Sequence, residues 1–508
     1  MLPSSARTRK SAFISLPASA GVLLALCQPP VSLSLLAYVA LVPLLYSLKE
    51  GEDRRNFLMG LGAGIVCWAG LVYWVVVAMN TYGGIGIPLS LCALGLLVLY
   101  LSLYTGFFTW LISFLEHRLR IPVYLSAPVV WVLLEYVRGR FLSGFPWSLL
   151  AHSQYNVLPL VQVVSITGTY FLSFLIVAVN CLIYYVLSRR RFPMAYGTLV
   201  IALLAASVVF GAIRLSEPTK GTLKASIVQG NIRQDVKFDE AYKAATVRKY
   251  VDLTLANSRG SNLIIWPETA MPFILLGDRA GREIFSVPAA LSSDLLLGTI
   301  AIDRLGRYYN AAYVLGRDGH IMGEYAKVHL VPFGEYTPLA GYFPFLREMS
   351  VAAGDFSSGP GHSPVASDSG KIGVLICFEG VFPEITNETV REGAEVLVNI
   401  TNDAWYNRTS APFQHFAFYV FRAVETDRYL LRAANTGISA VIDPRGRVLA
   451  RTGLFEERVL NGSFSLRHGE TIYVRYGDYF VFLCFLFLCG LLVSGALRGR
   501  MKKPRLRS

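Results

Sequence analysis

Long apolar runs at both ends of this 508-residue chain constrain its fold more than any other feature. A helix needs roughly 20 apolar residues to cross a bilayer. We expect such helices at 11–27, 30–48, 57–78, 87–115, 122–138, 158–187, 194–213 and 478–497. Only 16% of the residues are charged, whereas a soluble globular chain carries about 25%. The sequence therefore predicts a polytopic α-helical membrane protein with about eight transmembrane helices.

The first apolar run has an alternative interpretation. It follows a basic N-terminus and could be a signal peptide, with a lipoprotein-type cleavage site near Cys27. Leu26 is bulky where such a site needs a small residue, which favours a membrane helix. Pro29, Pro30 and Pro43 break or shorten the first two runs.

The middle of the chain has the composition of a water-soluble domain of about 250 residues, enough for a core of its own. We predict a transmembrane helical domain over 1–215, an inserted catalytic domain over 216–470, and a final helix with a basic tail over 471–508. In the middle part, β-branched apolar runs alternate with helical stretches, as in layered α/β domains. The expected strands are 225–229, 263–266, 295–300, 311–315, 372–376, 396–400 and 438–442, and the expected helices include 240–257 and 412–434.

The basic residues gather beside the apolar runs. The net charge is +13, and short basic clusters occur at 7–10, 54–55, 118–120, 189–191 and 498–507. Such clusters mark the cytoplasmic side of membrane proteins. We therefore expect both termini in the cytoplasm and the middle domain on the opposite side, which is the periplasm in a bacterium. Because no soluble face concentrates the positive charge, nucleic acid is excluded as a partner.

The cysteines single out one thiol. Six of the seven lie in apolar runs, and only Cys377 lies in the middle domain. That domain cannot form an internal disulfide, so the lone thiol needs another explanation.

Three polar residues flank predicted strands of the middle domain. Glu268, in Trp-Pro-Glu, suits a general base because it is partly desolvated, although an exposed turn residue is an equal alternative. Lys327 precedes Pro-Phe-Gly-Glu, and a fixed ammonium can stabilise an oxyanion, although most lysines are solvated. Cys377 ends a strand, where a turn can present a nucleophile, although a buried apolar cysteine is commoner. The three together are far more specific than any one alone.

These motifs resemble the three signatures of the nitrilase superfamily. With the flanking helices, Val-Gln-Gly-Asn at 228–231 and Asn-Asp-Ala-Trp at 402–405, nearly the whole chain resembles the apolipoprotein N-acyltransferase family. The resemblance implies an αββα sandwich and transfer of a fatty acyl chain from a phospholipid, typically phosphatidylethanolamine. The acceptor is the α-amine of the S-diacylglyceryl cysteine of a diacylated apolipoprotein, in the last step of lipoprotein maturation at the bacterial inner membrane. We expect a monomer and no metal or other cofactor.

The resemblance also assigns roles by motif. Glu268 is the base, Lys327 the oxyanion stabiliser, and Cys377 the nucleophile that carries a thioester in a ping-pong mechanism. Glu335 and Glu379 match supporting carboxylates, and a backbone N–H near the residue after the nucleophile shares the oxyanion.

Several aromatic and polar residues are candidates for substrate binding. Phe378 and Phe238 stand where the family often has Tyr and Trp, so both keep an aromatic face and lose a polar group. Asn402 and Trp405 lie in the Asn-Asp-Ala-Trp motif. Trp147, in Gly-Phe-Pro-Trp, is either a wall of the acyl entrance or an interfacial anchor. The apolar stretches 271–276 and 342–346 are either lids toward lipid or buried core.

Two rival functions use the same features. A membrane-tethered amidase or nitrilase would hydrolyse a small C–N substrate with the same triad, although one anchor would then suffice. The non-enzyme alternative is a transporter or receptor with an outer domain. Transport would need ionisable residues inside the spans, and only Glu135 and Arg138 lie near the end of one.

Overall fold

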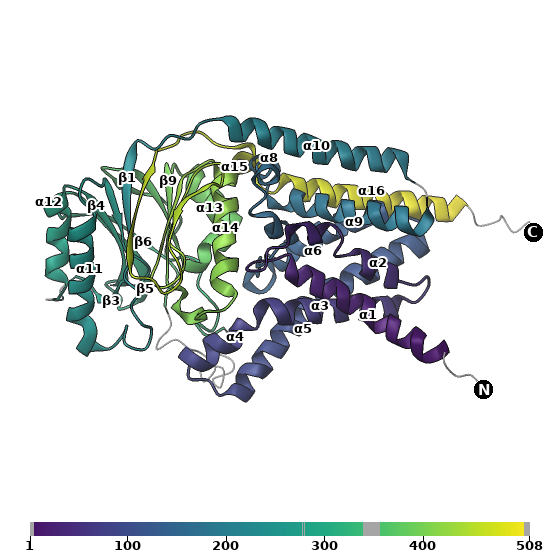
Figure 1. Cartoon of the computed structure of the whole chain (residues 1–508), viewed down its shortest axis with the longest axis horizontal. Coiled ribbons are helices and arrows are strands. Elements are labelled where there is room, and N and C mark those ends of the chain that lie inside the picture. Colours follow the sequence, from purple (N-terminus) through teal and green to yellow (C-terminus); the bar gives the residue numbers. More distant parts are fainter. Residues whose placement is uncertain (1–4, 191, 277, 279, 339–355, 502–508) are drawn as a thin grey trace, which may run out of the picture. The chain divides into compact units, whose positions relative to one another are not determined.

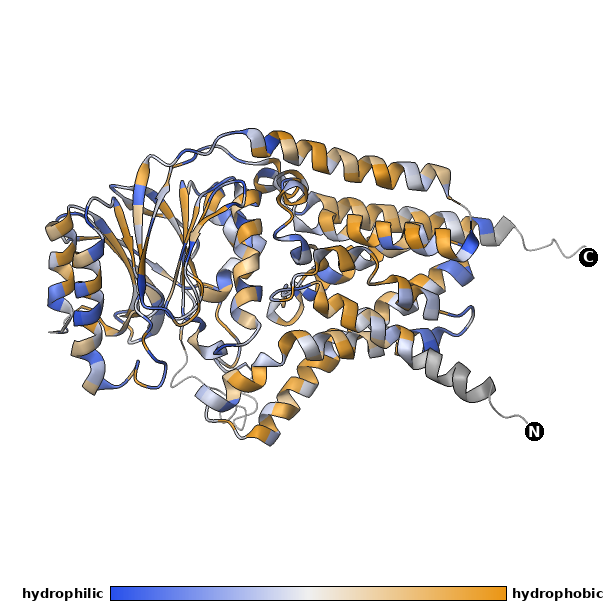
Figure 2. Ribbon diagram, viewed as in Figure 1, coloured by the Kyte–Doolittle hydropathy of each residue, from blue (hydrophilic) through white to orange (hydrophobic). Residues whose placement is uncertain are grey.

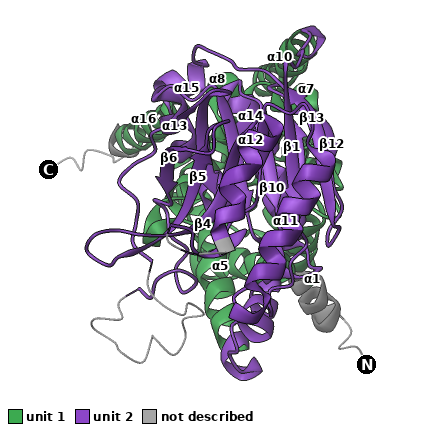
Figure 3. Ribbon diagram, turned by 90° about the vertical axis from the view of Figure 1, so that its left-hand side faces the viewer, with its two compact units in different colours: residues 1–73, 91–214, 478–508 green, residues 74–90, 215–477 purple. Residues whose placement is uncertain are grey.

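The computed structural model describes residues 5–190, 192–276, 278, 280–338 and 356–501, and the chain divides into two compact units (Figure 3). The first unit combines residues 1–73, 91–214 and 478–508, and the second combines 74–90 and 215–477. Residues 74–90, which the sequence places in the transmembrane domain, therefore group with the middle domain.

The first unit is helical. Five of the described helices are long and apolar enough to cross a membrane, namely Asp53–Val72, Ile87–Leu119, Thr169–Arg189, Met194–Ser216 and Tyr479–Arg498. Figure 2 shows that apolar residues cover these helices along their length. The helical elements of this part of the chain are α1 (Ser5–Leu26), η1 (Ser34–Tyr38), α2 (Val42–Ser47), α3 (Asp53–Val72), α5 (Ile87–Leu119), α6 (Val123–Arg138), η3 (Phe141–Ser143), η4 (Leu150–Gln154), α7 (Leu158–Val161), α8 (Val164–Thr167), α9 (Thr169–Arg189), α10 (Met194–Ser216) and α16 (Tyr479–Met501).

Two of the eight expected spans are wrong as continuous helices. The span at 30–48 is divided into η1 and α2, because Pro43 lacks a backbone N–H and takes the first turn of a new helix. The span at 158–187 begins with the short helices α7 and α8, and the long helix α9 starts only after Gly168, whose φ is +73°. A glycine accepts this left-handed conformation without strain, so the chain turns there before the helix begins.

The second unit contains two β-sheets. The first has seven strands in the order β13-β1-β2-β4-β5-β6, with β3 paired to β4, and the second has six in the order β12-β11-β10-β9-β8-β7. The strands are β1 (Leu223–Gln229), β2 (Leu263–Ile265), β3 (Met271–Ile274), β4 (Asp294–Ile302), β5 (Tyr308–Leu315), β6 (Ile321–Ala326), β7 (Val365–Ser367), β8 (Gly370–Ile376), β9 (Val396–Thr401), β10 (Leu430–Ala434), β11 (Ala440–Ile442), β12 (Val448–Arg451) and β13 (Arg458–Phe464).

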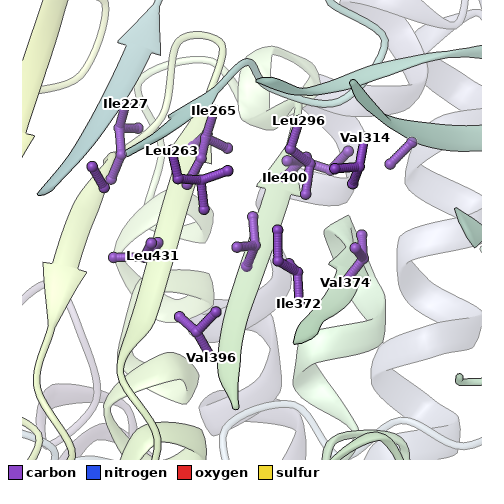
Figure 4. Close-up of a cluster of buried hydrophobic side chains, with 14 of the residues drawn as sticks. Ile227, Leu263, Ile265, Leu296, Val314, Ile372, Val374, Val396, Ile400 and Leu431 are labelled. Atoms are coloured by element: carbon purple, nitrogen blue, oxygen red, sulfur yellow. The ribbon is translucent and has the colours of Figure 1, made fainter. Parts of the chain in front are cut away.

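The two sheets pack face to face. Their inner faces share one buried apolar cluster, in which Ile227, Ile265 and Leu296 of the first sheet meet Val374 and Ile400 of the second (Figure 4). Residues of α11 and α12 pack on the outer face of the first sheet, and α13 and α14 pack on the second (Figure 1). The unit is therefore an α/β sandwich with helices on both outer faces, which confirms the layered α/β class predicted for the middle domain.

The helices of this unit complete the layers. They are α4 (Trp74–Val77), η2 (Ala78–Tyr82), η5 (Glu240–Tyr242), α11 (Lys243–Asn257), η6 (Ala280–Ser286), α12 (Val287–Leu291), η8 (Cys377–Val381), α13 (Pro383–Arg391), η9 (Asp403–Tyr406), α14 (Ala411–Thr426) and α15 (Ile472–Tyr476).

One expectation for the middle domain is wrong. The helix expected over 412–434 ends at Thr426, because Asp427 takes a left-handed conformation, and Leu430–Ala434 forms strand β10. For the stretch 271–276 the structure supports the buried-core alternative, since Met271–Ile274 forms β3 and Met271 and Leu275 are buried in the core. The second such stretch, 342–346, lies outside the described residues.

The segment 74–90 reaches the loop after β9. The Trp74 ring meets the Tyr406 ring edge-on with centroids 4.9 Å apart, and Tyr82 meets Trp405 at 6.1 Å. The Trp74 indole N–H also donates to the side-chain oxygen of Gln414 at 3.2 Å. These contacts hold α4 and η2 against η9, directly beside the residue that follows strand β9.

Candidate active site

Glu268 lies in the turn after β2 and is buried. One carboxylate oxygen accepts a hydrogen bond from the side-chain amide of Asn310 at 2.7 Å, and the other accepts from the backbone N–H of Asn402 at 2.8 Å. Asn310 belongs to β5 of the first sheet, whereas Asn402 follows β9 of the second. The carboxylate is therefore fixed from both sheets of the sandwich.

Lys327 follows β6 and is buried beside two carboxylates. Its Nζ lies 2.8 Å from Glu335 Oε2 and 3.8 Å from Glu268 Oε1. Burial opposes the charged form, but Glu335 and Glu268 outweigh it and raise the pKa of Lys327 above its ordinary value. Asn310 also donates to Glu335 at 2.8 Å, so one amide group links both glutamates. The two carboxylates therefore hold Lys327 in place and favour its charged form.

Cys377 stands at the turn between β8 and η8 with φ of +53°. Side chains other than glycine rarely adopt this conformation, and such strain is concentrated at functional sites. Burial and the charge of Glu268 raise the pKa of the Cys377 thiol, and Lys327 lowers it to a smaller extent. Cys377 is therefore a thiol in the substrate-free site. Glu379, two residues after Cys377, accepts from the backbone N–H of Val328, the neighbour of Lys327, and Lys327 lies 3.8 Å from Glu268. The three residues singled out by the sequence therefore lie in one site.

Glu379 is fully buried and organises the loop that follows Lys327. One oxygen accepts from the Tyr325 hydroxyl at 2.9 Å and from the backbone N–H groups of Val328 and His329, and the other accepts from the N–H of Ile376 at 2.8 Å. Burial raises the pKa of Glu379 to about 7, although these backbone donors and Lys327 oppose the shift. Glu379 thus ties the ends of β6 and β8 together beside Cys377.

The four substrate-contact candidates lie in different environments. Trp147 is buried in the first unit, where its ring stacks on Phe145 and its carbonyl accepts from Arg138. Phe238 is 56% exposed, so it can meet a ligand from solvent or lipid. Asn402 touches Glu268 through its backbone, and Trp405 is partly buried against Tyr82.

Two family models match different parts of this chain. Residues 20–182 match the apolipoprotein N-acyltransferase N-terminal domain, and residues 224–470 match the carbon-nitrogen hydrolase family. An apolipoprotein N-acyltransferase from Geobacter metallireducens is 40% identical over 477 residues, which cover 91% of each chain.

The chain belongs to the apolipoprotein N-acyltransferase family. A further member from Azotobacter vinelandii is 33% identical over 90% of each chain. Among solved structures, Saccharomyces cerevisiae Nit3, of branch 10 of the nitrilase superfamily, is 18% identical with a TM-score of 0.39 and covers 49% of this chain and 92% of that one.

Family membership confirms the resemblance seen in the sequence. The chain is an N-acyltransferase of the nitrilase superfamily and a multi-pass membrane protein. The transporter interpretation is therefore wrong.

Two site residues escaped the sequence analysis. Asn310 lies in an apolar strand, and nothing in its neighbours indicates that it links two glutamates. Lys237 is buried, and its Nζ donates to the backbone carbonyl of Glu268 at 3.0 Å. Most lysines are solvated surface residues, so only the folded structure shows that Lys237 is buried beside Glu268.

Gly298 of β4 leaves room for the turn that carries Glu268. A Cβ at this position would lie 2.5 Å from the Pro267 carbonyl oxygen and 2.7 Å from the Glu268 Cα, which are both backbone atoms. We expect Gly298→Ala to displace Glu268 and to lower acyl transfer by about 10²-fold, since catalysis is sensitive to displacements near 1 Å. Gly361→Ala, which meets nothing within 4 Å, is the matched control. Equal rates for both variants would show that the turn tolerates the shift.

Burial of Lys237 lowers the free energy of unfolding by an amount that depends on pH. Burial lowers the pKa of Lys237 to about 7, although Glu268 and Cys377 oppose the shift. Between pH 7 and about 10.4, Lys237 is protonated in the unfolded chain but largely neutral in the folded protein. The free energy of unfolding therefore rises with pH in this window. Below pH 7 the folded protein must carry the buried charge, so the full loss of stability is present there. We expect Lys237→Met to raise the melting temperature in detergent more at pH 6 than at pH 9. An increment that is the same at both pH values would contradict this expectation.

Proposed function

We propose that this acyltransferase moves the sn-1 acyl chain of a phospholipid such as phosphatidylethanolamine to the α-amine of the S-diacylglyceryl cysteine of an apolipoprotein. The observation that carries the proposal is the joint placement of Glu268, Lys327 and Cys377, from three strand ends, in one buried site. The names of the relatives support the class of acceptor.

In the first half-reaction, Cys377 attacks the ester carbonyl carbon while Glu268 takes the thiol proton. A pre-formed thiolate is not needed, which suits a thiol whose pKa is raised by burial. Lys327 and the backbone N–H of Phe378 stabilise the oxyanion. The C–O bond then breaks, Glu268 returns the proton to the departing oxygen, and lysophospholipid leaves a thioester on Sγ.

In the second half-reaction, the apolipoprotein amine attacks the thioester carbonyl carbon. Glu268 takes the proton from the nitrogen, the C–S bond breaks, and the proton passes to the sulfur. The N-acylated lipoprotein leaves and the thiol is restored. Because the first product leaves before the second substrate reacts, the kinetics are ping-pong.

Glu335 and Glu379 support this chemistry without touching the reacting atoms. Glu335 holds the Lys327 ammonium at 2.8 Å, and Glu379 ties the loop after Lys327 to the end of β8. Phe238, Asn402, Trp405 and Trp147 are proposed substrate contacts.

The membrane arrangement follows from charge. In the proposed topology both termini lie in the cytoplasm and the catalytic domain, expected over 216–470, faces the periplasm from the inner membrane. The five membrane-length helices are then joined by α1, by η1 with α2, and by α6, which complete eight crossings. Holding the site at the bilayer avoids extracting acyl chains into water at roughly 0.8 kcal/mol for each CH₂ group.

The test is intact mass spectrometry of the purified protein incubated with phospholipid labelled in the sn-1 chain, without acceptor. An adduct of one labelled acyl mass that hydroxylamine removes, and that a diacylated lipopeptide discharges to an N-acylated product, is the expected result. Labelled sn-2 phospholipid is the control for position. Release of free fatty acid without an adduct, or turnover of a small amide, would instead favour a membrane-tethered hydrolase.

A further inference from the structure

The backbone carbonyl of Cys377 is surrounded by buried donors from the second sheet and α14. The Tyr419 hydroxyl donates to this oxygen at 2.8 Å, and the Asn399 side-chain amide lies at 3.4 Å. His415, one turn before Tyr419 on α14, also interacts with the Cys377 backbone. A carbonyl oxygen has two lone pairs, so these donors restrict its direction strongly.

This carbonyl shares a peptide plane with the Phe378 N–H. The peptide unit is rigid and trans, so its C=O and N–H point in opposite directions. Fixing the carbonyl of Cys377 toward α14 therefore fixes the Phe378 N–H away from α14. A hydrogen bond to the carbonyl also polarises the N–H of the same peptide unit and strengthens it as a donor.

The donor Tyr419 is itself held in a buried polar network. His415 Nε2 lies 3.0 Å from the Tyr419 hydroxyl, and His415 Nδ1 lies 2.9 Å from Asp403 Oδ1. Arg432 donates to Asp403 Oδ2 at 2.8 Å, and its guanidinium lies 4.7 Å from the centre of the Tyr419 ring. All four side chains are at most 1% exposed. A network this deeply buried fixes its members only when they are mutually paired.

The number of hydrogens on each group decides which group donates in each hydrogen bond of this network. The Tyr419 hydroxyl has one hydrogen, and the Cys377 carbonyl can only accept, so that hydrogen points to the carbonyl. His415 Nε2 must then carry a hydrogen and donate to the Tyr419 oxygen. Burial opposes ionisation of Asp403, but Arg432 and His415 outweigh it and lower the pKa of Asp403. His415 Nδ1 is then an acceptor, and Arg432 Nη2, which can only donate, lies 3.1 Å from it. The charged Asp403 pairs with the same Arg432 nitrogen at 2.8 Å.

We propose that Tyr419 and His415 are positioning residues that hold the Cys377 carbonyl and thereby direct the Phe378 N–H at the oxyanion. Asp403 and Arg432 hold His415 in the required orientation. This inference rests on the proposed role of Cys377 as the acylated nucleophile. In this proposal Tyr419 and His415 contribute to transition-state stabilisation although they lie outside the Glu-Lys-Cys triad. They act through the carbonyl side of the turn at Cys377.

The experiment compares two reactions of the same thiol in the purified full-length protein. Acylation by phospholipid passes through an oxyanion, whereas alkylation by iodoacetamide displaces iodide from a saturated carbon and forms none. We expect Tyr419→Phe to slow formation of the acyl adduct by about 10- to 100-fold, somewhat less than loss of a direct oxyanion donor. Alkylation of Cys377 should stay within about twofold of the unmodified protein. Tyr429→Phe, which removes the hydroxyl of another buried tyrosine of the same unit, is the control.

A second pair of variants covers the case in which Tyr419→Phe folds poorly. His415→Gln retains an N–H donor near the position of Nε2, and His415→Leu removes it. We expect the glutamine variant to acylate faster than the leucine variant, with similar alkylation rates and similar melting temperatures.

The outcomes separate the two proposals. Unchanged acylation in Tyr419→Phe, or acylation and alkylation that fall in parallel, would overturn the positioning role. Failure of the unmodified protein to form any acyl adduct on Cys377 would overturn the proposed function, and the inference with it.

Discussion

Replacing Cys377 by serine is expected to leave the protein folded in the membrane and to lower acyl transfer by about 10⁴-fold or more, in line with the loss of other covalent nucleophiles. The fold should tolerate the change because serine has the same shape and is only slightly smaller, so the core cluster that includes Cys377 loses little packing. The measurement is transfer of labelled acyl chain to a diacylated lipopeptide in detergent.

The size of this effect follows from proton affinity. Burial and Glu268 already raise the pKa of the Cys377 thiol, and Glu268 must remove its proton during attack. A serine hydroxyl holds its proton far more tightly than a thiol, so the same carboxylate is too weak a base for it. Any adduct that the serine variant forms would be an oxygen ester, which mild hydroxylamine treatment leaves in place.

Another buried cysteine supplies the control. Cys181 of α9 is fully buried in the first unit, and Cys181→Ala should retain transfer close to that of the unmodified protein. If the Cys377→Ser variant transferred acyl chains at the unmodified rate, the thioester mechanism would be refuted.

The catalytic motifs were visible in the sequence because they lie beside recognisable strands. Glu268 and Cys377 each follow a short apolar run that was predicted as a strand. Lys327 follows β6, which was not among the predicted strands, so only its motif singled it out. Their meeting in one buried site could only be inferred by resemblance, since β2, β6 and β8 belong to two different sheets.

The polar network behind Cys377 could not be predicted from the sequence. Asp403, His415 and Arg432 come from η9, α14 and β10. Asp403 lies in the Asn-Asp-Ala-Trp motif, but nothing in the sequence indicates that His415 and Arg432 pair with it. The sequence over 412–434 also concealed the change from α14 to β10, because the apolar residues of a buried helix and of a buried strand cannot be told apart by composition. Pairing of β10 with β9 depends on long-range contacts that no local pattern contains.

Lys327→Met is expected to abolish transfer and also to destabilise the protein. Loss of the oxyanion cation removes an interaction worth about 10²- to 10³-fold in rate for a single donor, and a full charge should be worth more. The same change leaves Glu268 and Glu335 without the ammonium that lies 3.8 and 2.8 Å from them. Breaking a buried ion pair in this way costs roughly 3–5 kcal/mol, which is a large part of a typical stability.

A double variant separates the two effects. Glu335→Gln removes one of the two uncompensated charges, so Lys327→Met combined with Glu335→Gln should recover part of the lost melting temperature and none of the activity. Stability that recovers together with activity would indicate that Lys327 acts only by supporting the fold. Lys224→Met, at an exposed lysine of β1, should change neither quantity, because a solvated charge contributes little to stability. Full transfer by Lys327→Met would remove the ammonium from the oxyanion site and leave the Phe378 N–H as its remaining proposed donor.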